Sequence, residues 1–272
     1  TNYVYSGTAS MGVYAWGVMV QNGSTLTPYI PITRTGLNSL SVTKSGSSVL
    51  SISGSLNPIN LNGNLSLNSG LVNIGGKTIQ VAGNVVNNSE IQATLAGRVR
   101  LNGDLPQNIS GNGSGIFPHL VLAHIGGPSG SVQYTSNANF KIVNSLEMAS
   151  DYLFSIGNKR ITFLPSASLI ASSGTFSNNR FIQTGGFLSD AGIEKEYNSS
   201  NTSFTFAFGT GTHYTPASIS FSSAPTTYGA LNVRPVAVKH LYVTDPDALD
   251  YYWTKGFLQT KYGTMKIEFF DE

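Results

Sequence analysis

The 272-residue chain is sparsely charged and contains no cysteine. Charged residues make up 10 % of it, against roughly a quarter in ordinary soluble domains, so its polar surface must come from Ser, Thr, Asn and Gly. An aromatic content of 11 % predicts an ordered chain. A net charge of +2 without a basic run argues against nucleic acid as a partner. The lack of cysteine excludes a disulfide framework and a thiolate metal site.

The first 36 residues form a β-rich segment that is richer in Tyr and Trp than the residues after it. Glycines and an Asn22-Gly23 turn divide it into short strands. Because the terminal units of a stacked protein differ from the inner ones, we expect residues 1–36 to be an N-terminal cap or the first turns of a coil. Tyr14 and Trp16 fit that capping role, and a sugar-stacking platform that contacts a glycan is the alternative.

The stretch 56–105 contains two successive copies of one unit, Gly63–Ala82 and Gly83–Asp104. Each copy is about twenty residues long and alternates short strands with Asn-Gly, Ser-Gly or Gly-Gly turns, which is typical of one turn of a stacked β-solenoid. One turn, here called a rung, cannot bury its apolar side alone, so the rungs must stack. In the preceding segment Leu40 and Val42 alternate with hydroxyl residues and should point inward.

Asparagines recur near the turns of this repeat, where they tolerate left-handed geometry and can bond the backbone. Some of them are expected to form an internal ladder between rungs. The members are Asn60, Asn62, Asn64 and Asn68.

Strand patterns continue from residue 115 to about Leu188. His119 and His124 lie five residues apart, and so on opposite faces of a strand. A zinc pair on a strand needs an even spacing and further ligands, so no metal is expected there; instead one histidine should be exposed and the other packed at the edge of a rung.

The polar stretch 189–203 carries Glu194, Lys195 and Glu196, and this pattern predicts a solvated loop with a short helical turn or a hairpin tip. Alternating phenylalanines resume the strands after it. Strands at 230–236, 250–255 and 264–270 indicate a meander or part of a sandwich, with a brief helical turn at 245–248.

These patterns together predict an all-β protein. We expect a right-handed parallel β-solenoid (β-helix) over residues 37–222, followed by a small antiparallel β-sandwich-like portion over 223–272. The hand follows the general preference of parallel crossovers. No stretch approaches the roughly 18 apolar residues of a membrane-spanning helix, so no span is expected.

The second half of the chain carries short motifs in a fixed order: GIFPHLVLAHIGG (115–127), NSLEMASDYLFSIGNKRITF (144–163), NNRFIQTGGFLS (178–189), FTFAFGTGTHYTPASISFS (204–222), ALDYYWTK (248–255) and KIEFF (266–270). This order resembles a segment repeated in large secreted surface proteins of the Bacteroidota. The chain departs from that pattern at Ala207 and Phe208, where the family has Pro-Val, and at His119, where it has Asn.

Proteins of that family are exported through the type IX secretion system and act as adhesins, gliding-motility components or stalks. The resemblance therefore implies an extracellular or cell-surface location, with surface or glycan ligands and the secretion machinery as partners. It also implies a sorting domain elsewhere in a longer chain. A start at Thr1 without Met, and a terminal strand pattern, fit a mature or excised piece of such a chain.

No catalytic constellation is evident, and neither a catalytic residue nor a cofactor is expected. Glycoside hydrolysis needs a carboxyl pair at a defined separation, whereas the acidic residues of the central rungs are isolated. The one acidic cluster, Asp245, Asp247 and Asp250, is a weak calcium candidate because it lacks the alternating ligands and glycine of known loops.

Three hypotheses remain open. The first is a non-catalytic structural or adhesive surface segment. The second is a carbohydrate-active β-helix enzyme, such as a polysaccharide lyase or glycoside hydrolase, in which Glu147, Asp151 and Asp190 converge in a groove. The third is a filament subunit that polymerises through exposed edge strands.

Overall fold

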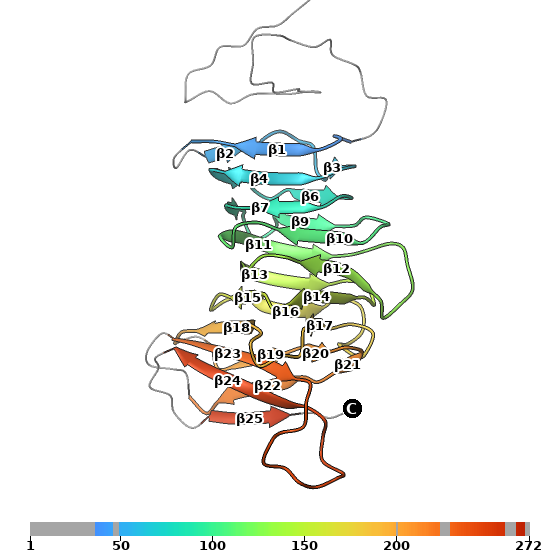
Figure 1. Ribbon diagram of the computed structural model, residues 1–272. Coiled ribbons are helices and arrows are strands. Elements are labelled where there is room, and N and C mark those ends of the chain that lie inside the picture. Colours follow the sequence, from blue (N-terminus) through green and yellow to red (C-terminus); the bar gives the residue numbers. More distant parts are fainter. Residues whose placement is uncertain (1–35, 46–48, 200, 224–228, 259–264, 270–272) are drawn as a thin grey trace, which may run out of the picture.

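The computed structural model describes residues 36–45, 49–199, 201–223, 229–258 and 265–269, and Figure 1 shows their course. Within these ranges the protein is all-β, with no helix. It forms a parallel β-solenoid of about seven turns, with a small antiparallel sheet near the C-terminus. The predicted fold class is thereby confirmed.

Three ladders of parallel strands build the coil, and most rungs contribute one strand to each. The first ladder contains β1 (Leu40–Thr43), β4 (Leu65–Ser69), β7 (Val85–Asn87), β10 (Gln107–Ser110), β12 (Val132–Ser136), β14 (Leu153–Gly157), β17 (Ile182–Thr184) and β20 (Phe208–Thr210). The second contains β2 (Val49–Ser51), β5 (Leu71–Asn73), β8 (Glu90–Gln92), β11 (Gly115–Leu122), β13 (Phe140–Met148), β15 (Arg160–Phe163) and β18 (Gly192–Tyr197). The third contains β3 (Ile59–Leu61), β6 (Thr78–Val81), β9 (Arg98–Leu101), the second halves of β11 and β13, and β16 (Ser168–Ala171).

The rungs differ in length. Paired residues in the first ladder lie 20 positions apart at Leu65 and Val85, and 28 apart at Phe154 and Ile182. Strands therefore stay in register while the connections between them vary. Because parallel pairing aligns the inward positions of every rung, one alternating pattern suffices to bury a continuous core.

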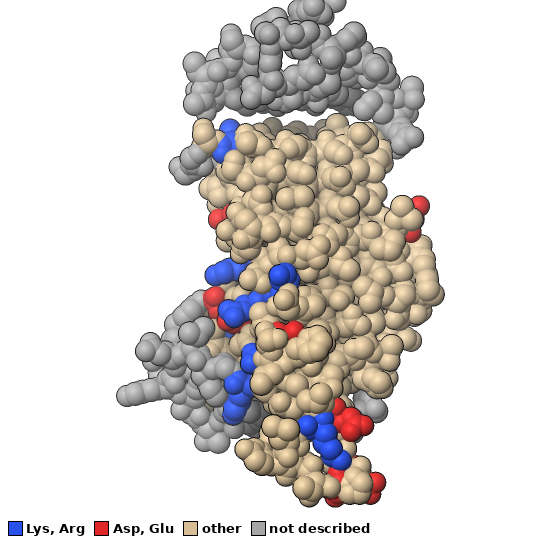
Figure 2. All heavy atoms as spheres, in the orientation of Figure 1, with Lys and Arg blue, Asp and Glu red and all other residues tan. Residues whose placement is uncertain are grey.

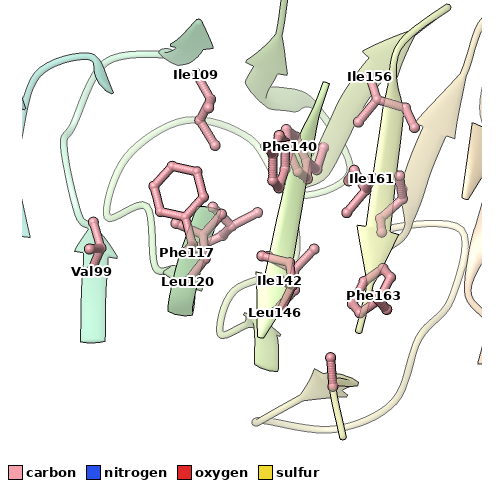
Figure 3. Packing of buried hydrophobic residues seen from close by; sticks show 14 of the residues in the cluster. Val99, Ile109, Phe117, Leu120, Phe140, Ile142, Leu146, Ile156, Ile161 and Phe163 are labelled. Carbon is pink, nitrogen blue, oxygen red and sulfur yellow. The ribbon is translucent and has the colours of Figure 1, made fainter. Parts of the chain in front are cut away.

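One large apolar cluster fills the interior along the coil, and a second, smaller cluster contains Leu153, Phe181, Ala207 and Tyr214. Figure 3 shows its central part, where aliphatic side chains from β9 and β10 meet larger side chains from β11 to β15. Phe140 stacks on Phe154 with 6.2 Å between ring centroids, and it meets Phe117 edge-on with 5.5 Å between centroids. Burial of these apolar rings is the main source of stability.

Glycine is required at the corner before the first ladder, because adjacent rungs approach closely there. A Cβ on Gly83 would lie 2.7 Å from the carbonyl oxygen of Gly63, and a Cβ on Gly103 would lie 2.3 Å from that of Ala82. Both separations are shorter than any real Cβ contact. The glycines of the repeat thus mark the places where one rung rests on the next.

Asparagines that directly follow these corner glycines link one rung to the next. The Asn84 N–H donates to Oδ1 of Asn64 at 2.8 Å, and the Asn108 N–H donates to Oδ1 of Asn84 at 2.8 Å. Asn64 in turn donates its N–H to Ser39 Oγ. A ladder of asparagines between rungs is therefore present at Asn64, but it lies on the exposed corner of the coil, and the expectation of an internal ladder is wrong.

The parallel coil gives way to antiparallel pairing near the C-terminus. Strand β23 (Gly229–Val236) pairs antiparallel with β18, and β24 (Tyr252–Leu258) pairs antiparallel with β23. A second antiparallel sheet contains β19 (Ser203–Phe206), β22 (Ala217–Phe221) and β25 (Met265–Phe269), while β21 (His213–Tyr214) turns back on β20.

The three-stranded sheet covers the end of the coil. Phe204 contacts Phe163 at 5.1 Å between ring centroids, and Phe221 contacts Tyr197 edge-on at 4.9 Å. These rings belong to the same cluster as the coil interior. Antiparallel pairing of β19 with β22 begins before residue 223, where the C-terminal portion was expected to start.

The prediction of a solvated loop over 189–203 is wrong. Residues Gly192–Tyr197 form β18, in which Glu194 and Lys195 are buried. Local composition predicted solvent exposure, whereas pairing with β15 on one side and β23 on the other covers the strand. At 245–248, where a brief helical turn was expected, the chain makes a single turn in which the Ala248 N–H donates to the Asp245 carbonyl at 3.2 Å, and this turn does not extend into a helix.

Candidate functional site

The residues singled out from sequence as possible ligand contacts do not form one site. Tyr14 and Trp16, the expected glycan platform, lie outside the described residues, as does the expected N-terminal cap up to residue 35. The calcium candidates Asp245, Asp247 and Asp250 are exposed on the loop between β23 and β24. There, Oδ1 of Asp245 accepts the N–H of Asp247 at 2.9 Å, which is a local turn.

The described part of the chain contains no group of three or more His, Asp or Glu side chains that could hold a metal ion. The three aspartates therefore do not form a cluster of calcium ligands.

The three acidic residues of the enzyme hypothesis have separate structural surroundings. Asp151 pairs with Arg180, whose side chain is buried, at 2.5 Å. Asp190 is buried and accepts the Phe187 N–H at 3.0 Å. Glu147 lies on the outer side of β13. Two of the three thus hold loops in place.

The two histidines have different environments. His124 is buried and packs edge-on against Tyr152, with 5.0 Å between ring centroids, and against Tyr134 at 6.0 Å. Burial lowers its pKa, which a Coulombic attraction from Asp104 partly opposes. The expectation of a packed histidine fits His124, whereas His119 is half-buried on the outer side of β11.

The outer side of the third ladder carries the most varied set of functional groups in the coil. Parallel register aligns its outward side chains in two rows, here called the polar rows. The first row contains Thr78, Arg98, His119, Ser145 and Ser168, and the second contains Gln80, Arg100, Val121, Glu147 and Ile170. Alternation forces this placement, because Val99 and Leu101 of β9 point into the core and leave Arg98 and Arg100 outside.

A histidine–serine contact lies in the first polar row. Nδ1 of His119 lies 2.7 Å from Ser145 Oγ, which is mostly buried. Nε2 of His119 is buried and has no hydrogen-bond partner. Burial is the main cause that lowers the pKa of His119; Arg98 lowers it further, and Glu147 opposes both.

The two arginines of the polar rows have no carboxylate partner among the described residues. Three ion pairs occur there, Lys141–Glu196, Arg160–Glu194 and Arg180–Asp151, and neither Arg98 nor Arg100 belongs to any of them. Arg98 makes one long contact, from Nε to the Ala96 carbonyl at 3.5 Å. An unpaired guanidinium fork presents donors suited to a planar anion.

Sequence analysis missed the polar rows because it searched for acidic pairs. The signal was present as the pattern Arg-Val-Arg-Leu at 98–101, which in a strand places both arginines on one face. Their alignment with His119 and Ser145 depends on register between rungs of unequal length, and no local pattern gives that register.

Lys195 is a second functional group that the sequence placed wrongly. Its ammonium group lies inside the coil end and donates to the carbonyls of Leu164, Pro165 and Ala167 at 2.7–2.8 Å. It also lies 5.2 Å from the centre of the Phe204 ring. The ammonium group thus satisfies three backbone carbonyls of one turn, which gives Lys195 a structural role.

No protein-family model matches the chain, and neither a curated protein nor a solved structure is significantly similar to it. Among the described residues, no helix is long and apolar enough to cross a membrane. The fold defines the protein as a β-solenoid with an antiparallel C-terminal cover.

Chemically, the polar rows offer cationic donors, a histidine whose lowered pKa favours the neutral ring, and hydroxyl and amide groups on one flank. Asn102 extends this set, since its Nδ2 donates to Gln80 Oε1 at 3.0 Å. Groups of these kinds can bind a polar, anionic ligand without a metal or cofactor of their own.

Proposed function

We propose that this chain is a non-catalytic, extracellular segment of a large cell-surface protein, where it acts as a stalk and adhesive module exported by type IX secretion. The observation that carries the proposal is the continuous first ladder, in which eight strands from β1 to β20 pair in parallel without interruption. Hydrogen bonds of such a ladder run along the coil axis, so the segment resists bending and stretching along that axis.

The surface fits the same role. Figure 2 shows mostly uncharged residues over the upper rungs, with Lys and Arg gathered over the middle and lower rungs of one flank. Ser, Thr and Asn side chains provide hydration there, and the ladder of corner asparagines replaces salt bridges as the link between rungs. A surface of this kind is insensitive to salt, as a secreted spacer requires.

The dimensions indicate a part of a longer rod. Strands of one sheet lie about 4.8 Å apart, so seven rungs extend roughly 34 Å. A spacer of that length projects a ligand site only if further segments of the parent chain continue it. This agrees with the order of motifs that resembles a repeated segment of large surface proteins.

The proposal is tested by locating the segment on intact cells that express the parent protein. Protease treatment of intact cells should release peptides of residues 36–258, while a cytoplasmic marker protein stays protected. Deleting this segment from the parent chain should leave export unchanged and reduce attachment of the cells to glycan-coated surfaces. Recovery of the segment only after cell lysis would contradict the proposal.

A further inference from the structure

We propose that the polar rows bind carboxylate groups of an acidic polysaccharide, with Arg98 and Arg100 as the carboxylate ligands. The inference rests on the proposed adhesive function and names its ligand class and its site.

Two neighbouring guanidinium groups lack a carboxylate partner among the described residues. Arg98 and Arg100 are two residues apart on β9, so their Cα atoms lie about 6.6 Å apart on the same face. Neither belongs to an ion pair among the described residues. Two adjacent cations repel each other, and folding alone gives no reason to place them together. An anion bound between the two forks removes that repulsion.

A ring nitrogen without a hydrogen-bond partner lies next to the two arginines in the polar rows. His119 occupies the register position next to Arg98, and its Nε2 is buried without a hydrogen-bond partner. A buried polar atom in that state costs free energy, and a ligand oxygen that displaces the side chains covering it would satisfy it. The Ser145 contact on Nδ1 fixes the orientation of the ring.

The rest of the polar rows combines amide groups with apolar surface. Gln80 and Asn102 supply amide donors and acceptors on the far side of the arginines, while Ile170 supplies exposed apolar surface at the far end of the second row. A sugar ring presents the same mixture, with hydroxyl groups at its rim and C–H groups on its face. Rungs repeat every 4.8 Å or so, which is close to the length of one sugar unit in an extended polysaccharide.

Glu147 gives the site a direction. It lies in the second row two rungs from Arg100, with Val121 between them. A ligand carboxylate is therefore attracted at the β9 end and repelled at the β13 end. This arrangement fits an acidic glycan whose charged unit sits over Arg98 and Arg100 and whose hydroxyls extend toward Ser145.

The test measures binding by isothermal titration calorimetry on the whole 272-residue chain. The probes are a galacturonic acid oligosaccharide and its methyl-esterified form, which has the same length without the charge. The double variant Arg98→Gln/Arg100→Gln removes both forks. The double variant Lys44→Gln/Lys239→Gln removes the same net charge away from the polar rows and serves as the matched control.

We expect the acidic oligosaccharide to bind and the esterified form to bind at least tenfold more weakly. The arginine variant should lose tenfold or more in affinity, because it lacks both charged hydrogen-bond donors. The lysine control should bind as the wild type does. Arg98→Lys/Arg100→Lys should recover part of the affinity, since it keeps the charge and loses the fork.

Absence of binding by the acidic probe, or an equal loss in the lysine control, would overturn the proposal. Thermal unfolding of each variant shows whether it is folded, and the outward position of both arginines predicts an unchanged melting temperature. The protease treatment of intact cells is independent of this binding experiment. A segment found on the cell surface that ignores acidic glycans would refute the site and leave the stalk role standing.

Discussion

Lys195 allows a sharp test of the packing at the coil end. Its side chain is 2 % exposed, and burial, opposed by a Coulombic attraction from Glu196, lowers its pKa from 10.5 to about 8. The three carbonyl hydrogen bonds favour the charged form and limit the shift. An unfolded chain has no such environment, so the amine there keeps its ordinary pKa.

The sign of the pH effect follows from this difference. Below pH 8 both states hold the proton, and the folded state carries the full penalty of a buried charge. Between about pH 8 and 10.5 the folded state releases the proton while the unfolded state keeps it, so stability rises with pH. The difference between a pKa of 10.5 and one of about 8 corresponds to at most about 3.5 kcal/mol, at roughly 1.4 kcal/mol for each pKa unit.

The perturbation is Lys195→Met, which fills similar volume and cannot titrate. Urea unfolding at pH 7, 8, 9 and 10 gives the free energy of unfolding of wild type and variant. The wild type should gain about 2.5 kcal/mol relative to the variant between pH 7 and pH 10. The difference in free energy of unfolding between wild type and variant cancels the contributions of groups that both proteins share. One such group is Tyr134, whose pKa is raised mainly by burial and whose titration lowers stability at high pH.

Lys44→Met, a change of the same kind at a half-buried position after β1, is the control and should show no comparable slope. A wild-type minus Lys195→Met difference that stays flat from pH 7 to 10 would show that the amine is solvated or remains charged. The placement of β18 inside the coil end would then be wrong.

Three further predictions concern the coil itself. Gly83→Ala should destabilise the protein by about 1–3 kcal/mol because the new Cβ meets the Gly63 carbonyl, whereas Gly76→Ala, whose Cβ would have no neighbour closer than 3.4 Å, should be tolerated in the same urea titration. Asn84→Ala should cost about 1 kcal/mol by removing the acceptor for the Asn108 N–H, and Asn84→Asp should retain most of the stability; equal losses would show that the ladder does not contribute. Phe154→Ala should cost about 3–5 kcal/mol by calorimetry, and a loss below 1 kcal/mol would contradict a packed interior.

The solenoid was predictable because its determinants are local. Gly83 and Asn84 form a corner at which a glycine permits close approach and an amide bonds the next rung, and the same pair of requirements recurs at Gly63 and Asn64. Each corner restarts the alternation that points aliphatic side chains inward. Fold class and strand direction follow from that repetition without knowledge of distant contacts.

The failures lie where tertiary pairing overrides local composition. The Glu-Lys-Glu run at 194–196 has the composition of a loop, yet β15 and β23 flank it and the interior accepts the lysine because a turn of backbone offers three carbonyls. The polar rows were missed for a related reason. Arg98 and Ser145 are 47 positions apart, and only the register of the intervening rungs places His119 between them.

The distribution of ion pairs separates structural charge from functional charge in this protein. The three ion pairs among the described residues all involve strands or loops from β13 onward, where rungs lengthen and parallel pairing changes to antiparallel. The earlier rungs are linked by asparagine, serine and glycine corners and need no ion pair. Arg98 and Arg100 lie in those earlier rungs, so the packing of the coil does not account for them. The anionic ligand that we propose for the polar rows would account for them.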